Sequence, residues 1–212
     1  MATSPLKILV TGGAGYIGSH TVRQLLAAGH QVTVVDNLYS GHRWAVPTTA
    51  DFHQLDAGDE IAMSSLLRQQ RTDAVIHFAG HIVVPESIAE PAKYYRNNVV
   101  ASLNLIRACC ASGVGYFIFS SSAAVYGDPK QVPVAEHHPT IPINPYGRTQ
   151  LITEWTLRDM ALGGRQGNTG LKYVALRYFN VAGASLDGIL GQATPEATHL
   201  IKVACETSTG QR

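Results

Sequence analysis

Short apolar runs alternate with longer amphipathic segments along almost the whole chain. The apolar runs have the length of buried strands and lie at 6–10, 31–36, 51–55, 74–78, 115–120 and 172–178. Helical spacing of apolar residues extends up to about residue 28 and recurs at 59–70, 94–111, 145–160 and 195–210, and the glycine-rich stretch 163–170 predicts a surface loop. Continuous apolar strands that alternate with helices indicate a parallel sheet with helices on both faces. We therefore predict an α/β fold with a doubly wound parallel sheet.

A glycine-rich turn joins the first predicted strand to the first helix. Gly13, Gly15 and Gly18 have the spacing G-x-G-x-x-G, and Gly12 adds a series spaced by three. Such glycines permit a tight turn and bring backbone N–H groups close to a pyrophosphate, at a helix N-terminus that favours anions. The second strand ends on Asp36, whose carboxylate can bind adenosine ribose hydroxyls and repel a 2′-phosphate. Together these features predict a Rossmann domain that binds NAD rather than NADP.

Composition and charge argue against several other classes of protein. The 212 residues carry a formal net charge of +1 without a basic block, so nothing indicates nucleic acid or a membrane surface. No apolar segment approaches the roughly 20 residues that span a bilayer, and the N-terminus does not resemble a signal peptide. The three cysteines have no metal-ligand spacing, the histidines form no ligand cluster, and we predict no metal site. Reduced thiols fit a cytoplasmic protein.

A second group of polar residues follows the strand at 115–120. The string Ser120-Ser121-Ser122 lies at the carboxyl end of that strand, the edge where open α/β sheets bind ligands. Tyr146 begins a predicted helix, and Gln150 lies four residues later on the same face. A lysine at position 150 would lower the pKa of the Tyr146 phenol, whereas glutamine has no charge. Arg148 is two residues from Tyr146 and points off that face.

Several strings in combination resemble the extended short-chain dehydrogenase/reductase superfamily and, within it, the UDP-glucose 4-epimerase family of NAD-dependent epimerases and dehydratases. They run through nearly the whole chain: TGGAGYIG at 11–18, VDNL at 35–38, HFAG at 77–80, PES at 85–87, YYRNNV at 94–99, FSSSAAVYG at 119–127, NPYG at 144–147 and LRYFNVAGA at 176–184. The resemblance implies an NAD-binding Rossmann domain over 1–180 and the incomplete start of a substrate-binding region over 181–212. It also implies a UDP-sugar substrate and suggests a homodimer through the helices at 94–111 and 145–160.

The resemblance assigns roles to residues by their positions. Ser122 and Tyr146 fall on the catalytic serine and tyrosine, and Gln150 falls on the catalytic lysine. The cofactor-lining positions are Gly12, Gly15, Tyr16, Ile17, Gly18, Asp36, Asn37, Asp56, Ala57, Phe78, Ala79, Gly80, Asn97, Ser120, Tyr146 and Tyr178. The substrate positions are Ser122, Tyr146, Phe179, Asn180 and His199.

The implied reaction is the interconversion of UDP-glucose and UDP-galactose through a transient oxidation at sugar C4. Tyr146 takes the proton of the 4-hydroxyl while the C4 hydride passes to NAD, and the 4-keto sugar turns and takes the hydride back on its other face. Related dehydratases carry an acidic pair just after the catalytic serine or threonine. Ala123 and Ala124 hold those places here, which argues against loss of water.

Two departures from the family keep alternatives open. Gln150 replaces the lysine, and the family continues well beyond the length of this chain. We therefore expect impaired activity, and we expect Leu200, Ile201 and Val203 of the last helix to be partly exposed. A non-catalytic NAD-binding protein or fragment is one alternative, and another short-chain oxidoreductase acting on a sugar nucleotide is a second. A chain that is incomplete relative to the natural protein is a third.

Overall fold

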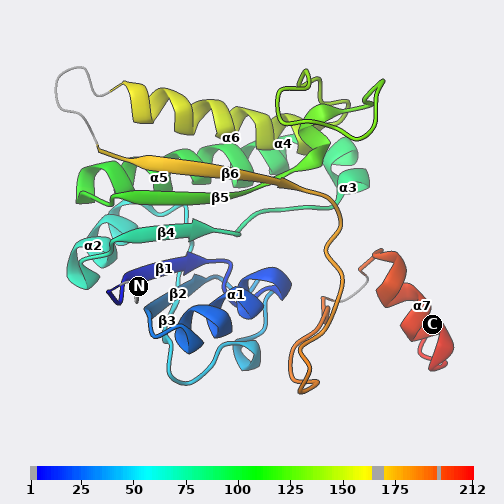
Figure 1. Ribbon diagram of the computed structural model, residues 1–212, viewed down its shortest axis with the longest axis horizontal. Coiled ribbons are helices and arrows are strands. Elements are labelled where there is room, and N and C mark those ends of the chain that lie inside the picture. Colours follow the sequence, from blue (N-terminus) through cyan, green and yellow to red (C-terminus); the bar gives the residue numbers. More distant parts are fainter. Residues whose placement is uncertain (1–3, 164–169, 195–196) are drawn as a thin grey trace.

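The computed structural model describes residues 4–163, 170–194 and 197–212. Its centre is a six-stranded sheet in the order β3-β2-β1-β4-β5-β6, in which every neighbouring pair is parallel. The strands labelled in Figure 1 are β1 Lys7–Thr11, β2 Gln31–Asp36, β3 Asp51–Gln54, β4 Ala74–His77, β5 Tyr116–Ser122 and β6 Lys172–Tyr178. The predicted doubly wound α/β fold is confirmed, and the strands end within two residues of their predicted limits.

Helices alternate with these strands. They are α1 Tyr16–Ala27, α2 Glu60–Gln70, α3 Val84–Ala89, α4 Pro91–Tyr94, α5 Ala101–Ser112, α6 Pro145–Leu162 and α7 Leu200–Ser208, with 3₁₀ turns η1 Arg43–Ala45 and η3 Ala123–Tyr126 and a π-helical segment η2 Tyr95–Val100. Within the described parts of the chain, no helix combines the length and apolar composition needed to cross a bilayer.

Three of these elements differ from the sequence-based expectation. The predicted helix at 94–111 begins earlier, because α4, η2 and α5 form one helical stretch from Pro91 to Ser112. The short elements α3 and η3 were not predicted, since fewer than two turns leave little apolar periodicity to detect. Most of the loop predicted at 163–170, and the first residues of the helix predicted from 195, lie outside the described residues.

Two apolar cores lie on opposite faces of the sheet. One packs α2, α5 and α6 against the sheet through residues such as Leu105 and Leu157. The other packs α1 through Val22. Because successive side chains of a strand point to opposite faces, Leu9 belongs to the first core and Val10 to the second. The strands near β1 are therefore buried on both sides, which holds their carboxyl ends in fixed positions.

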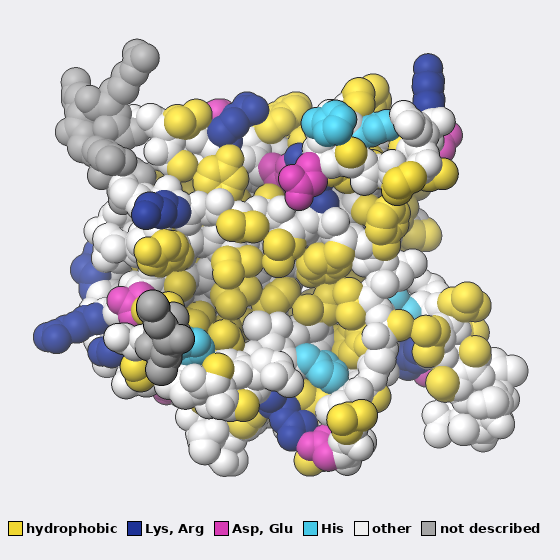
Figure 2. Space-filling model, viewed as in Figure 1, with side chains coloured by type: hydrophobic (Ala, Val, Ile, Leu, Met, Phe, Trp, Pro, Cys, Tyr) yellow, Lys and Arg dark blue, Asp and Glu magenta, His cyan; other side chains and the backbone are white. Residues whose placement is uncertain are grey.

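The face that carries α1 is open over β5 and β6 in the part of the chain that the structure describes. Tyr116, Val174 and Leu176 point to this face and are exposed, and Figure 2 shows apolar side chains gathered across its middle. Helix α7 lies beyond the sheet in Figure 1, and none of its residues is buried. Leu200 and Ile201 are exposed, as predicted.

Candidate active site

The turn between β1 and α1 brings backbone so close to backbone that only glycine fits. Gly12 has a φ of +68°, and a Cβ added to it would lie 2.6 Å from the main-chain nitrogen of Ala79. A Cβ on Gly18 would lie 2.1 Å from the carbonyl oxygen of Gly12. Gly15 caps α1, whose first turn has no acidic side chain to offset the positive end of the helix dipole. This turn therefore has the shape and polarity that the phosphates of a dinucleotide require.

Asp36 ends β2 beside the glycine turn. Its side chain is buried, and its carboxylate accepts the N–H of Ala14 at 2.9 Å and the N–H of Leu38 at 2.8 Å. A carboxylate has about four acceptor positions, so about two remain for the hydroxyls of a ribose. A phosphate at the same place would be repelled by the carboxylate charge. The donors and acceptors at this turn fit NAD.

The predicted cofactor residues gather at the edge of the sheet where the parallel strands end. After β1 come Gly12, Gly15, Tyr16, Ile17 and Gly18; β2 ends with Asp36 and Asn37; Asp56 and Ala57 follow β3; Phe78, Ala79 and Gly80 follow β4; and Ser120 and Tyr178 lie near the ends of β5 and β6. Asn97 and Tyr146 approach from η2 and α6. Their contact with a cofactor stays a prediction.

Asn98 was not singled out from the sequence, yet it ties the loop after β4 to α6. Its Oδ1 accepts the N–H of His81 at 2.8 Å, and its Nδ2 donates to the carbonyl oxygen of His81 at 2.9 Å and to Oγ1 of Thr149 at 3.2 Å. Its neighbour Asn97 donates to the same Oδ1 at 3.0 Å. The sequence signal that could have revealed Asn98 is the pair of adjacent asparagines within a helical stretch. A buried amide side chain there needs hydrogen-bond partners from other elements.

Ser122 and Tyr146 meet from β5 and α6. The Ser122 hydroxyl lies near enough to the Tyr146 phenol to lower the pKa of that phenol, and it accepts the N–H of Ala124 at 3.1 Å. Asn144 caps α6 by accepting the N–H of Gly147, and the Ser87 hydroxyl accepts the N–H of Tyr146 at 3.2 Å. These two hydrogen bonds fix the first turn of the helix. The two hydroxyls that the sequence proposes as catalytic are therefore neighbours in the fold.

Burial is the main influence on the Tyr146 phenol. It raises the pKa of Tyr146; the nearby Tyr178 adds to the rise, while the hydrogen bond from Ser122 opposes it. Tyr178 is itself hydrogen-bonded to the Ser120 hydroxyl, and burial also raises its pKa. The Tyr146 phenol is thus mostly protonated near neutral pH, with Ser122 placed to stabilise the phenolate that forms on deprotonation.

Gln150 lies one helical turn after Tyr146 and is buried against β5. Its Nε2 donates to the carbonyl oxygen of Ser120 at 3.1 Å, and it brings no charge to the site. Arg148 is exposed, whereas Thr149 and Gln150 are buried. The prediction that Arg148 points away from the Tyr146 face is confirmed, so it does not supply the cation that position 150 lacks.

The predicted substrate residues beyond β6 lie near the surface. Phe179 and Asn180 follow the strand and are exposed. His199 immediately precedes α7, and its Nδ1 lies 3.3 Å from Nε2 of Gln192. Their roles in binding a substrate stay predictions.

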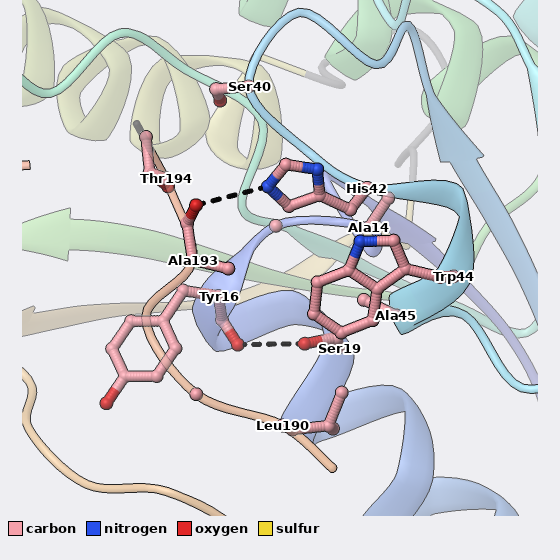
Figure 3. Close-up of a pocket in the computed structure, with 12 residues that line it drawn as sticks. Ala14, Tyr16, Ser19, Ser40, His42, Trp44, Ala45, Leu190, Ala193 and Thr194 are labelled. Carbon is pink, nitrogen blue, oxygen red and sulfur yellow. Dashed lines mark hydrogen bonds between the residues drawn. The ribbon is translucent and has the colours of Figure 1, made fainter. Parts of the chain in front are cut away.

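The segment after β6 folds back onto the start of α1. The Tyr16 hydroxyl donates to the carbonyl oxygen of Gly183 at 2.5 Å, and Arg23 pairs with Asp187 at 2.6 Å. Figure 3 shows the small pocket that results, where the His42 ring lies 3.3 Å from the carbonyl oxygen of Ala193. The sequence did not reveal this packing, because Tyr16 and Gly183 are 167 residues apart.

The family profile described as "NAD dependent epimerase/dehydratase family" matches residues 8–209 of this chain. A UDP-glucose 4-epimerase of Azospirillum brasilense is 51% identical over 211 residues, which cover 100% of this chain and 59% of that enzyme. A UDP-glucose 4-epimerase of Lactobacillus helveticus is 50% identical over 92% of this chain and 58% of its own length.

Solved structures give the same result. The crystal structure of UDP-glucose 4-epimerase from Brucella ovis in complex with NAD superposes with a TM-score of 0.93 at 45% identity, covering 98% of this chain and 62% of that one. The chain thus spans about three fifths of the length of these relatives. With a profile match over most of its length and relatives at about half identity, the chain belongs to the NAD dependent epimerase/dehydratase family.

Proposed function

We propose that this chain is the cofactor-binding and catalytic part of a UDP-glucose 4-epimerase. The observation that carries the proposal is the placement of Ser122 beside Tyr146, where it lowers the Tyr146 pKa, at the same sheet edge as the glycine turn and Asp36. The names of the two enzyme relatives support UDP-glucose and UDP-galactose as the substrates. Under this proposal, residues 1–180 form the dinucleotide domain, and 181–212 begin the substrate-binding region.

NAD is the proposed cofactor. When bound, it supplies a group that can accept a hydride from an alcohol carbon and return it. The backbone of Gly12, Gly13 and Gly15 would hold the diphosphate, and the Asp36 carboxylate would hold the adenosine ribose.

Tyr146 moves the proton in the proposed reaction. Its phenolate accepts the proton of the sugar 4-hydroxyl as that carbon is oxidised, and the phenol gives the proton back when the opposite configuration forms. Ser122 stabilises the phenolate through the hydrogen bond that lowers the pKa of Tyr146. Ala123 and Ala124 supply neither an acid nor a base, so the site is suited to epimerisation rather than loss of water.

Gln150 weakens this proton transfer, because nothing at that position offsets the rise in the Tyr146 pKa that burial causes. General acid–base catalysis contributes roughly 10²- to 10⁴-fold to rate, and we infer that a sizeable part of it is missing. The same observation favours a second candidate function, an NAD-binding protein without turnover.

A homodimer is the proposed assembly. Its contact would be formed by the helical stretch that ends in α5, together with α6, since two helices from each subunit can form a four-helix seam. Val100 at the end of η2 and Trp155 of α6 are exposed on these helices, as apolar contact residues must be in a free subunit.

A coupled assay tests the proposed function by following conversion of UDP-galactose to UDP-glucose with added NAD, on the unchanged chain and on Gln150→Lys. A slow reaction that Gln150→Lys accelerates supports an epimerase weakened at one residue. Binding of NAD with no turnover by either protein supports the non-catalytic alternative. Net accumulation of NADH with a UDP-sugar would contradict epimerisation and indicate a different oxidoreductase.

A further inference from the structure

The loops that follow β2 and β4 meet each other across the end of β1. In the sheet β1 lies between these two strands, and its carboxyl end is the glycine turn. Strands separated by one neighbour are about 10 Å apart, so only long side chains can bridge them. Tyr39, in the loop after β2, reaches His81, in the loop after β4, with ring centroids 4.8 Å apart at 73°.

Lys93 completes this bridge from α4. Its Nζ donates to the Tyr39 hydroxyl at 3.2 Å and lies 5.5 Å from the centre of the Tyr39 ring. The same Nζ pairs with the Glu86 carboxylate at 2.5 Å, and the Tyr94 hydroxyl donates to that carboxylate at 2.8 Å. Lys93 is therefore held on the β4 side and makes a polar and a cation–π contact with the β2 side.

The two loops are anchored at their bases, whereas the Tyr39 side chain is largely exposed. His42 donates its N–H to the carbonyl oxygen of Ala14 at 2.9 Å, which fixes the first loop to the glycine turn. Asn98 holds both polar backbone groups of His81 and fixes the second loop. Tyr39 is 65% exposed, so its contacts with His81 and Lys93 are what keep its ring across the end of β1.

We propose that Tyr39, His81 and Lys93 form a clasp that retains the dinucleotide, and that Tyr39 is its moving part. The proposal rests on the proposed function, since it needs a dinucleotide at the glycine turn. A cofactor that is oxidised and reduced within each turnover has no need to leave, so slow release is compatible with catalysis. The clasp sets the rate of release, while Gly12 and Asp36 account for most of the binding.

The test is the rate at which bound NADH leaves the full chain, followed by its fluorescence after a chase with excess NAD. Tyr39→Ala removes the ring contact with His81 and both the hydrogen bond and the cation–π contact with Lys93, and it should speed release about tenfold, as a few exposed contacts predict. Tyr116→Ala is the matched control, because Tyr116 forms a similar cation–π pair with Lys172, at 5.7 Å, at the opposite edge of the sheet. Its release rate should equal that of the unchanged chain.

A double variant separates a clasp from loss of structure. If Tyr39 and Lys93 act as one unit, Tyr39→Ala with Lys93→Ala should release NADH no faster than the faster single variant. If the two single changes multiplied in the release rate of the double variant, the clasp proposal would be overturned. Equal release rates for Tyr39→Ala and Tyr116→Ala would overturn it as well. Either result would leave the cofactor assignment intact. Failure of the unchanged chain to bind NADH at all would overturn the proposed cofactor, and the clasp with it.

Discussion

Gln150 donates a hydrogen bond from its side-chain amide to the carbonyl oxygen of Ser120, 3.1 Å away, and so joins α6 to β5. This contact keeps the position packed and gives the side-chain amide nitrogen a partner although no lysine is present. The fold therefore tolerates the substitution, and its consequence lies in the charge of the site. Tyr146, one turn earlier on the same helix, has a raised pKa with burial as the largest cause.

Gln150→Lys should raise the turnover of UDP-galactose near neutral pH by about 10- to 100-fold, because a positive charge favours the Tyr146 phenolate. Activity that needs the phenolate rises with pH until the Tyr146 pKa is passed. The lysine should therefore move this rising limb to lower pH by about one unit or more. The measurement is kcat/KM against pH for both proteins. Gln150→Met, which removes the amide without adding charge, is the control and should leave the limb in place.

Ser122→Ala should have the opposite effect on the same profile. The Ser122 hydroxyl stabilises the phenolate and opposes the rise in the Tyr146 pKa, so its removal raises that pKa further. The rising limb should move to higher pH and turnover near neutral pH should fall, with NADH binding unchanged. Ser121→Ala alters the adjacent serine, whose hydroxyl donates to Glu154 instead. A limb that moves equally in both variants would argue against a specific role for Ser122.

The sequence predicted those parts of the molecule that depend on local pattern. The range of β6 was predicted correctly, since a run rich in β-branched, aromatic and apolar residues follows the glycine-rich stretch. Asp36 and the glycine turn were placed together because parallel strands end at one edge. The pairing of Tyr39 with Lys93 and of Tyr16 with Gly183 was out of reach, because periodicity and motifs describe neighbours in sequence. The partner of Gln150 was missed for the same reason.

The buried Glu154 and the partly buried Arg177 form an ion pair whose disruption should destabilise the fold. Arg177 donates to both carboxylate oxygens, from Nε at 3.0 and 3.1 Å and from Nη2 at 2.6 Å, and Ser121 donates to Oε1 at 2.5 Å. Removing Arg177 leaves the buried Glu154 carboxylate without a counter-charge. Arg177→Ala should lower the free energy of unfolding by about 3–5 kcal/mol in urea titrations.

An exposed ion pair on the same helix is the control for this prediction. Arg158 and Asp159 lie 3.4 Å apart and are well exposed to water. Asp159→Ala should change the free energy of unfolding by less than about 1 kcal/mol. Similar losses in the two variants would mean that the pair between Glu154 and Arg177 is not what holds β6 to α6.

His77 should make stability fall as the pH drops. It is fully buried at the end of β4, with Nδ1 2.6 Å from Oγ1 of Thr11 and Nε2 2.8 Å from Oγ of Ser102, and burial lowers its pKa to about 4. Between that value and the ordinary pKa of about 6.5, the unfolded chain binds a proton that the folded chain does not. Stability from His77 is therefore complete above about pH 6.5 and is lost progressively down to pH 4.

Over the interval from pH 7 to pH 5 the loss from this group should be about 2 kcal/mol in the free energy of unfolding. Other groups also titrate there, so the measurement is the difference in this loss between the unchanged chain and His77→Asn. The asparagine amide can take the place of Nδ1 beside the Thr11 hydroxyl but binds no proton, and the loss should shrink by about the same 2 kcal/mol. His53→Asn alters a partly exposed histidine paired with Asp51 at 2.9 Å and should leave the contribution of His77 in place. If His77→Asn kept the full pH dependence, the buried imidazole would not be the group that destabilises the fold in acid.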